Sequence, residues 1–320
     1  MRPHRLIQAF RLIQALRLIQ VLRLIQVLRL IQGRPAVMPA TLADLNEAPA
    51  AAFVAVLGAV FPHAPWIADA TAAQRPFATV EALFTALRGA VEGASDARRR
   101  ALLAPPPARI EPAASGLDRL SEADAARFAA LEAAYRERFG HAFILCVERH
   151  GRASLLANVE SRLAAPPEAE RRTAEAELMR IAAIRISALV TGPGALSTTG
   201  RISTHVLDTV QGKPAAGVAV TLVECISETD SVVVARAVTN ADGRTDGPLV
   251  HGRPVPRATY ELRFGLGDHF RRIGPALGLA LPEPPFLDVV PLRFGVDDPE
   301  GHYHVPLVAT PWSYQTYRGS

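Results

Sequence analysis

The sequence changes character near residue 190, and this change constrains the fold more than any other feature. Residues 41–190 are rich in Ala, Leu, Glu and Arg, with proline and glycine at the breaks, whereas β-branched runs follow residue 200. The first pattern is typical of helices and the second of short strands. Residues 191–200, TGPGALSTTG, have the composition of a linker. We therefore expect a multi-domain chain in which an all-α domain precedes an all-β domain.

The first half, residues 38–190, is predicted to be an all-α helical bundle. Apolar residues recur at helix-like intervals, most clearly near its end, where Leu178, Ile181 and Leu189 belong to one such series. Prolines and glycines separate the segments. The expected helices cover residues 41–60, 79–91, 95–104, 121–139, 152–164 and 167–190.

The second half, residues 201–320, is predicted to be an antiparallel β sandwich. The turn residues of Asn240–Gly243 separate two β-branched runs, and several short strands with such turns between them are typical of a sandwich. One helix is expected near residues 268–278. The expected strands cover residues 217–223, 231–238, 258–264, 286–294 and 303–309.

Residues 1–37 form a leader that repeats RLIQ with a period of six residues. This period spreads the arginines around a helix with 3.6 residues per turn, and an arginine in every repeat argues against a membrane span. We interpret the leader as a translated DNA repeat that is unstructured or not native, with a natural start at Met38. A membrane-binding or targeting helix is the alternative. Thr41 is expected to cap the first helix of the body.

Charge and cysteine content limit which partners and which cellular compartment are expected for this chain. The chain carries a formal charge of +4, but seven arginines and no acids lie in residues 1–37, so the remainder carries −3. The folded body therefore gives no electrostatic reason to expect nucleic-acid binding, and no membrane contact is expected for it. Cys146 and Cys225 lie in apolar runs of different halves, which indicates free thiols in a reducing compartment and a cytoplasmic protein. No Cys/His spacing suggests a metal site.

Four short motifs in the second half occur in an order that resembles one enzyme family. They are STHVLDT at Ser203–Thr209, NADGR at Asn240–Arg244, HYHVPL at His302–Leu307 and YRGS at Tyr317–Ser320. Together they resemble the 5-hydroxyisourate hydrolases, the enzyme branch of the transthyretin-like proteins. The resemblance implies a transthyretin-like sandwich that hydrolyses the small molecule 5-hydroxyisourate with no metal or cofactor. It also implies a homotetramer in which the C-terminal tail enters an active site between subunits.

The resemblance implies a role for each matched residue. His205 and His304 are the imidazoles for proton transfer, a task that suits neutral imidazole near pH 7. Arg244 offers a planar fork of donors for the substrate's carbonyl oxygens and for developing negative charge. Ser320, with its hydroxyl and terminal carboxylate, completes the catalytic set. The residues expected to bind substrate are Tyr317, Arg318 and Gly319.

Other residues near the motifs are expected to play no catalytic part. His302 and His269 are interpreted as structural histidines, and Gln315 stands where the family tail has a small hydroxyl residue, which is expected to alter packing or substrate contacts. A non-catalytic transthyretin-like binding protein is an alternative function. The intact motif set favours the enzyme, because the carriers do not keep it.

The helical half resembles a second enzyme family of the same pathway, the 2-oxo-4-hydroxy-4-carboxy-5-ureidoimidazoline (OHCU) decarboxylases. Fusion of the two is consistent with purine (urate) catabolism, because the hydrolase makes the unstable substrate of the decarboxylase. The matching pieces are His63–Trp66, Arg75–Phe77, Ser115–Leu120, Leu131–Gly140 and Ile184–Ile186.

The catalytic residues of this second family are only partly kept. Arg185 matches the family's arginine, and Glu111 matches its catalytic glutamate. The family's histidine follows a Leu-Leu pair, but here Leu102–Leu103 runs into Ala104–Arg109, which contains none. His63 and His141 are the nearby candidates to replace it; His63 precedes a turn and is interpreted as a surface or capping residue, whereas His141 lies in a motif that the family uses near its pocket. We expect a domain that keeps the fold and has lost or greatly weakened decarboxylation; a fully bifunctional enzyme that makes (S)-allantoin is the alternative.

Overall fold

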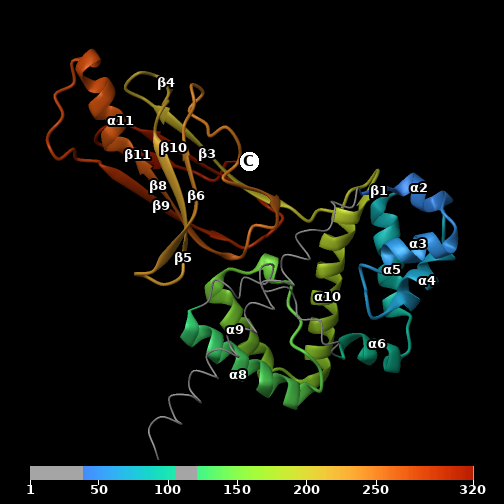
Figure 1. Ribbon diagram of the computed structural model, residues 1–320. Helices are drawn as coiled ribbons and strands as arrows, with labels where there is room; N and C mark the ends of the chain where they lie inside the picture. The colour runs from blue at the N-terminus through green and yellow to red at the C-terminus, as the bar shows by residue number, and fades with distance from the viewer. Residues whose placement is uncertain (1–38, 105–120, 320) are drawn as a thin grey trace, which may run out of the picture.

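The computed structural model describes residues 39–104 and 121–319 (Figure 1). The leader, Pro105–Pro107, Glu111 and Ser320 lie outside the described residues, so the predictions about them stay predictions. The described chain forms a helical half followed by a β sandwich, as the sequence predicts.

Helices fill the first half, and their starts follow local chemistry. The side chain of Thr41 accepts a hydrogen bond from the Asp44 backbone N–H and so caps the first helix as predicted. Thr79, Ser95 and Ser121 cap later helices in the same way. The elements are α2 (Leu42–Glu47), α3 (Ala50–Leu57), α4 (Pro65–Ala72), α5 (Val80–Glu92), α6 (Asp96–Leu103), α8 (Glu122–Phe139), the 3₁₀ turn η2 (Val147–Arg149), α9 (Arg152–Leu163) and α10 (Pro167–Leu189).

The expected helix over residues 41–60 is wrong in one respect, since it is two helices. The break falls at Ala48 and Pro49, whose backbones are extended. A residue before proline is pushed out of the helical region, which explains the break. The sequence prediction also missed α4, which starts with Pro65 in its first turn.

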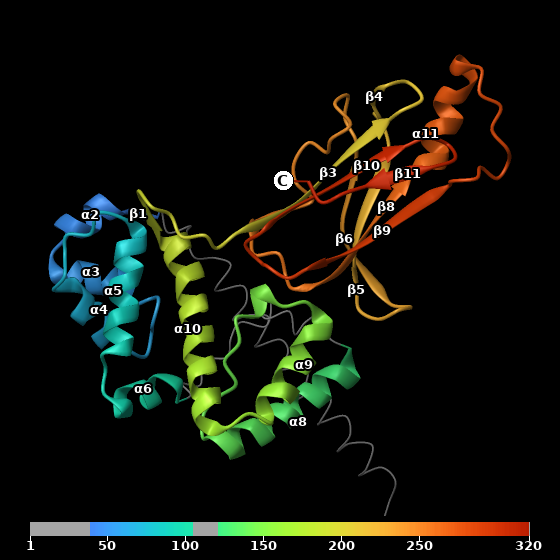
Figure 2. The ribbon, with the colours of Figure 1, turned by 180° about the vertical axis from the view of Figure 1, so that it is seen from behind.

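The long helix α10 lies between two groups of helices in both views (Figures 1 and 2). Its C-terminal part contributes Ala182 and Ile186 to a core with α2 to α5. Near its N-terminus, Glu170 forms a buried ion pair with Arg162 of α9. The strand β2 (Val190–Thr191) at its end pairs in parallel with β1 (Ala40–Thr41), which ties the two ends of the helical half together.

The second half is a sandwich of two sheets around one core. One sheet has the order β11-β10-β3-β4, with β7 also on β3, and the other has the order β6-β5-β8-β9. The strands are β3 (Gly200–Asp208), β4 (Lys213–Pro214), β5 (Ala219–Cys225), β6 (Ser231–Val238), β7 (Val250–Arg253), β8 (Ala258–Gly265), β9 (Val289–Val296), β10 (His302–Ala309) and β11 (Tyr314–Thr316). The expected helix appears as α11 (Leu266–Ile273) followed by the 3₁₀ turn η3 (Gly274–Leu277).

The sandwich is antiparallel with one exception, because β3 and β10 pair in parallel. Parallel neighbours need a long connection, and here the whole second sheet lies between them in the sequence. The predicted antiparallel sandwich is confirmed, with this one parallel pair in it. The exception brings two of the four motifs side by side.

The two halves touch where η2 meets the start of β8. The Arg257 N–H donates to the Arg149 carbonyl at 2.8 Å, and the Gly151 N–H donates to the Arg257 carbonyl at 3.1 Å. Arg149 also forms an ion pair with Glu300 of the sandwich. No helix in the described ranges 39–104 and 121–319 is long and apolar enough to span a membrane.

Candidate active site

The outer face of β3 carries the first part of the site. Burial alternates along this strand, so that Ile202, Thr204 and Val206 face the core. A strand places successive side chains on opposite faces. Arg201, Ser203 and His205 therefore share the outer face.

The parallel register places the second motif beside the first. His304 of β10 is the Cα partner of Ser203, and Pro306 is the partner of His205. His302 and His304 share a strand face because they are two residues apart. The predicted pair His205 and His304 thus comes together from segments that lie about a hundred residues apart in the sequence.

Arg244 reaches this face through a tight turn. The Val206 N–H donates to the Gly243 carbonyl at 2.8 Å, and a backbone bridge joins His205 to Arg244. Gly243 has φ +67°, and a Cβ there would lie 2.3 Å from the Val206 carbonyl oxygen. Only glycine fits so close an approach. The NADGR motif therefore fixes the arginine beside the first histidine.

The C-terminal tail closes the site from the β10 side. The Gly319 N–H donates to the His304 carbonyl at 2.9 Å. A Cβ on Gly319 would lie 2.5 Å from Cδ2 of His304, so the tail backbone packs directly on the imidazole. The Arg318 guanidinium instead lies over the Tyr303 ring, 5.1 Å from its centroid. Its predicted contact with substrate stays a prediction.

These elements enclose a hollow of about 430 Å³. A larger hollow of about 800 Å³ lies between the two halves, near Ser154 and Arg257, and contains none of the predicted site residues. We place the chemistry in the smaller one because the motif residues converge there. Its lining residues are Arg201, Ser203, Arg244, Pro248, His302, His304, Tyr317 and Gly319.

The pKa values of both predicted catalytic histidines are lowered, which favours the neutral imidazole near pH 7. Burial lowers the pKa of His205, the positive charge of Arg244 lowers it further, and a hydrogen bond to the Asp242 backbone partly offsets both. Burial also lowers the pKa of His304, followed by the charges of Arg244 and of the neighbouring histidines. Nε2 of His205 is buried and has no hydrogen-bond partner in the described part of the chain. An unsatisfied buried nitrogen costs about 1–3 kcal/mol, so its retention here points to a function.

Four residues that line the hollow were not predicted from the sequence as site residues: Arg201, Ser203, Pro248 and His302. The Ser203 Oγ lies 3.0 Å from His302 Nε2 and 3.0 Å from His304 Nδ1. The interpretation of His302 as purely structural is not supported by this placement on the site face. The two-residue spacing to His304 was the available signal. His269 lies instead in the interior, where its Nε2 is 3.2 Å from Asp208.

In the helical half, Arg185, the residue that matches the family's arginine, contacts a backbone carbonyl. Nη1 of Arg185 donates to the Val60 carbonyl at 2.8 Å. Burial lowers the pKa of Arg185, and nearby Glu148 opposes that shift. His141 packs edge-on against Tyr135, with ring centroids 5.4 Å apart.

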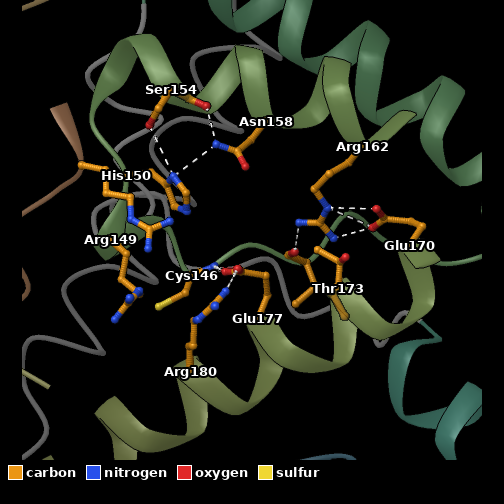
Figure 3. Close-up of polar contacts among 12 residues, drawn as sticks. Cys146, Arg149, His150, Ser154, Asn158, Arg162, Glu170, Thr173, Glu177 and Arg180 are labelled. Carbon is orange, nitrogen blue, oxygen red and sulfur yellow. Dashed lines mark hydrogen bonds and ion pairs between the residues drawn. The ribbon is translucent and has the colours of Figure 1, made fainter. Parts of the chain in front are cut away.

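Polar side chains hold the segment around Cys146 and His150 against α9 and α10 (Figure 3). The Cys146 N–H donates to Glu177 at 2.8 Å, and Glu177 also pairs with Arg180. His150 contacts Asn158 at 3.2 Å, and burial lowers its pKa to about 4. The groups in this cluster are partnered with one another, so we interpret it as structural.

Within residues 39–104 and 121–319, no group of three or more His, Cys, Asp and Glu side chains is arranged to hold a metal ion.

Comparisons with known proteins place both halves in families. Residues 202–319 match the model of the HIUase/Transthyretin family, and residues 46–187 match the model of OHCU decarboxylase. A 5-hydroxyisourate hydrolase of Deinococcus radiodurans is 56% identical over 37% of this chain and 95% of its own length. The chain therefore belongs to the HIUase/transthyretin family through its sandwich and to the OHCU decarboxylase family through its helical half.

Two further relatives extend the comparison. A 2-oxo-4-hydroxy-4-carboxy-5-ureidoimidazoline decarboxylase of Haloferax volcanii is 32% identical over 46% of this chain and 94% of its own length. The crystal structure of an (S)-allantoin synthase is 33% identical, covers 88% of this chain and 100% of that chain, and superposes with a TM-score of 0.48.

Proposed function

We propose that the sandwich hydrolyses 5-hydroxyisourate to OHCU as a step of urate degradation. The observation that carries the proposal is the convergence of Arg244, His304 and the tail on one hollow, with His205 joined to Arg244 by a backbone bridge. The proposal assigns residues 38–190 to a decarboxylase-like domain and 201–320 to the hydrolase, with 191–200 as linker. It needs no cofactor.

The chemistry is addition of water to a ring carbonyl, followed by cleavage of the C–N bond. Nε2 of His205 takes the proton of the attacking water, because it is neutral and has no competing partner. The oxygen that becomes negative is stabilised by the donors of Arg244. The leaving ring nitrogen then takes the proton back from His205. The Tyr317 ring and Gly319 border the hollow and limit how the flat substrate lies.

The proposed assembly is a homotetramer, in which the outer face of β3 and β10 lies between subunits and Ser320 completes the site. The exposed aromatic side chains of Tyr314, the first residue of β11, and of Trp312 just before it support a contact there, with exposed fractions of 41% and 50%. The free Cys146 and Cys225 support a cytoplasmic setting.

The test is the ultraviolet absorbance of freshly made 5-hydroxyisourate with the full-length protein. We expect accelerated decay that a chelator leaves unchanged, and a loss on the order of a hundredfold or more in His304→Gln. His251→Gln is the matched control, because His251 lies on β7 outside the hollow. Decay at the spontaneous rate with folded wild-type protein contradicts the proposal and favours a binding protein.

For the helical half we propose a retained fold with lost or strongly weakened decarboxylation. Residues 104–121 contain no histidine, and a missing acid–base group typically costs about 10²–10⁴ in rate. Arg185 is held by the Val60 carbonyl and remains available only as a binding group.

Circular dichroism of the allantoin formed from 5-hydroxyisourate tests this second proposal. Racemic product at the spontaneous rate supports it. Rapid formation of one enantiomer that Arg185→Met abolishes contradicts it, and establishes the bifunctional enzyme that makes (S)-allantoin.

A further inference from the structure

We propose that Arg201, His302 and Ser203 form a hydrogen-bonded relay that fixes His304 as a neutral Nε2–H donor. This inference deepens the proposed hydrolase function and rests on it for its effect on turnover. It assigns different tasks to the two histidines, with His205 as the base and His304 as a donor to the substrate oxygen.

The relay begins at Arg201, which fixes the ring of His302. Nη2 of Arg201 lies 3.1 Å from Nδ1 of His302. A guanidinium has only donors, so Nδ1 of His302 must accept and carry no proton. Neutral imidazole keeps one N–H, and it is therefore on Nε2. Burial and the charge of Arg201 both lower the pKa of His302, which agrees with the neutral ring.

The next hydrogen bond in the relay joins His302 to Ser203. Nε2 of His302 lies 3.0 Å from Ser203 Oγ, so the imidazole donates and the hydroxyl accepts. The hydroxyl proton of Ser203 is then free for another acceptor. Nδ1 of His304 lies 3.0 Å from the same oxygen, and the described residues offer Ser203 Oγ no other side-chain or backbone acceptor.

The end of the relay determines what His304 presents to the hollow. With Nδ1 accepting from Ser203, the single proton of neutral His304 is on Nε2. A neutral imidazole N–H is too weak an acid to give up its proton, but it is an effective donor to a developing oxyanion. His304 thus acts beside Arg244, whereas the buried unpartnered Nε2 of His205 takes the water proton.

The relay residues are positioning residues, and the tautomer of His304 is their direct readout. Full-length protein labelled with ¹⁵N at histidine, studied by solid-state NMR at about pH 8, where neutral imidazole prevails, distinguishes the two neutral forms. The His304 signal is assigned by its loss in His304→Gln. We expect only the Nε2–H form in the wild type, and a mixture of both forms in Ser203→Ala and in Arg201→Met.

Turnover gives the second readout. Ser203→Ala is expected to lower kcat on the order of tenfold with little change in KM, as for the loss of one hydrogen bond to a catalytic group. Ser203→Thr keeps the hydroxyl and is expected to restore both the tautomer and most of kcat. Ser231→Ala, on β6 of the other sheet, is the matched control.

Two outcomes of the NMR experiment would contradict the relay. An Nδ1–H form of His304 in the wild type, or an unchanged Nε2–H form in both Ser203→Ala and Arg201→Met, overturns the relay. Arg201 is exposed, so its variant remains informative if Ser203→Ala does not fold. The NMR readout needs no turnover: an inactive wild type with the expected tautomers refutes the hydrolase and leaves the relay standing.

Discussion

Replacing Gly319 by alanine tests whether the tail positions His304. The added Cβ would lie 2.5 Å from Cδ2 of His304, where ordinary contacts are 3.4–4 Å, so the ring or the tail must shift by about 0.9 Å. The tail is held by the hydrogen bond from the Gly319 N–H to the His304 carbonyl, 2.9 Å long. Moving the tail therefore costs this bond, and moving the ring takes His304 off its position.

A misplacement of about 1 Å in a catalytic group costs on the order of a hundredfold in rate. We expect kcat/KM for 5-hydroxyisourate to fall by about that factor in Gly319→Ala, measured by ultraviolet absorbance. The free energy of unfolding should change by no more than about 1.5 kcal/mol, because at most one backbone hydrogen bond at the chain end is lost. Gly295→Ala on β9 is the control, since nothing lies within 4 Å of its added Cβ. A folded Gly319→Ala protein within threefold or so of the wild-type rate refutes the reasoning.

Three further predictions concern charge, the tail and the helical core. Arg244→Gln should lower kcat about 10²–10³-fold. Because Arg244 lowers the pKa values of His205 and His304, its loss raises both pKa values. The acid limb of the pH–rate profile should therefore move to higher pH. An unmoved limb would contradict this origin of the shifts. Deleting residues 318–320 should abolish hydrolysis while circular dichroism shows a folded protein, and full activity would remove the tail from the site. Arg162→Met should destabilise the helical half by about 3–5 kcal/mol in denaturant unfolding, because it leaves the fully buried carboxylate of Glu170 without its cation. The double variant Arg162→Met/Glu170→Gln should recover much of this loss.

Elements whose signals are local could be predicted from the amino-acid sequence. Capping residues such as Thr41 marked helix starts, and strand-like runs marked five of the strands, β5, β6, β8, β9 and β10, because these preferences depend on neighbours within a few residues. The motifs also identified His205, Arg244 and His304, since each motif is a short contiguous string. The break at Pro49 was readable in principle from the rule for residues before proline, but it was missed.

How the motifs come together could not be predicted from the sequence and depends on the strand pairing. The parallel register of β3 and β10 joins segments about a hundred residues apart, and no local preference specifies which residues face each other across such a distance. That register puts Ser203 between His302 and His304. His302, which the sequence alone suggested to be structural, is therefore part of the site. The direction of Arg318, over Tyr303 and away from the hollow, is likewise set by packing. Side-chain placement across strands follows from which strands pair and in what register, and the shared core of the sandwich sets both.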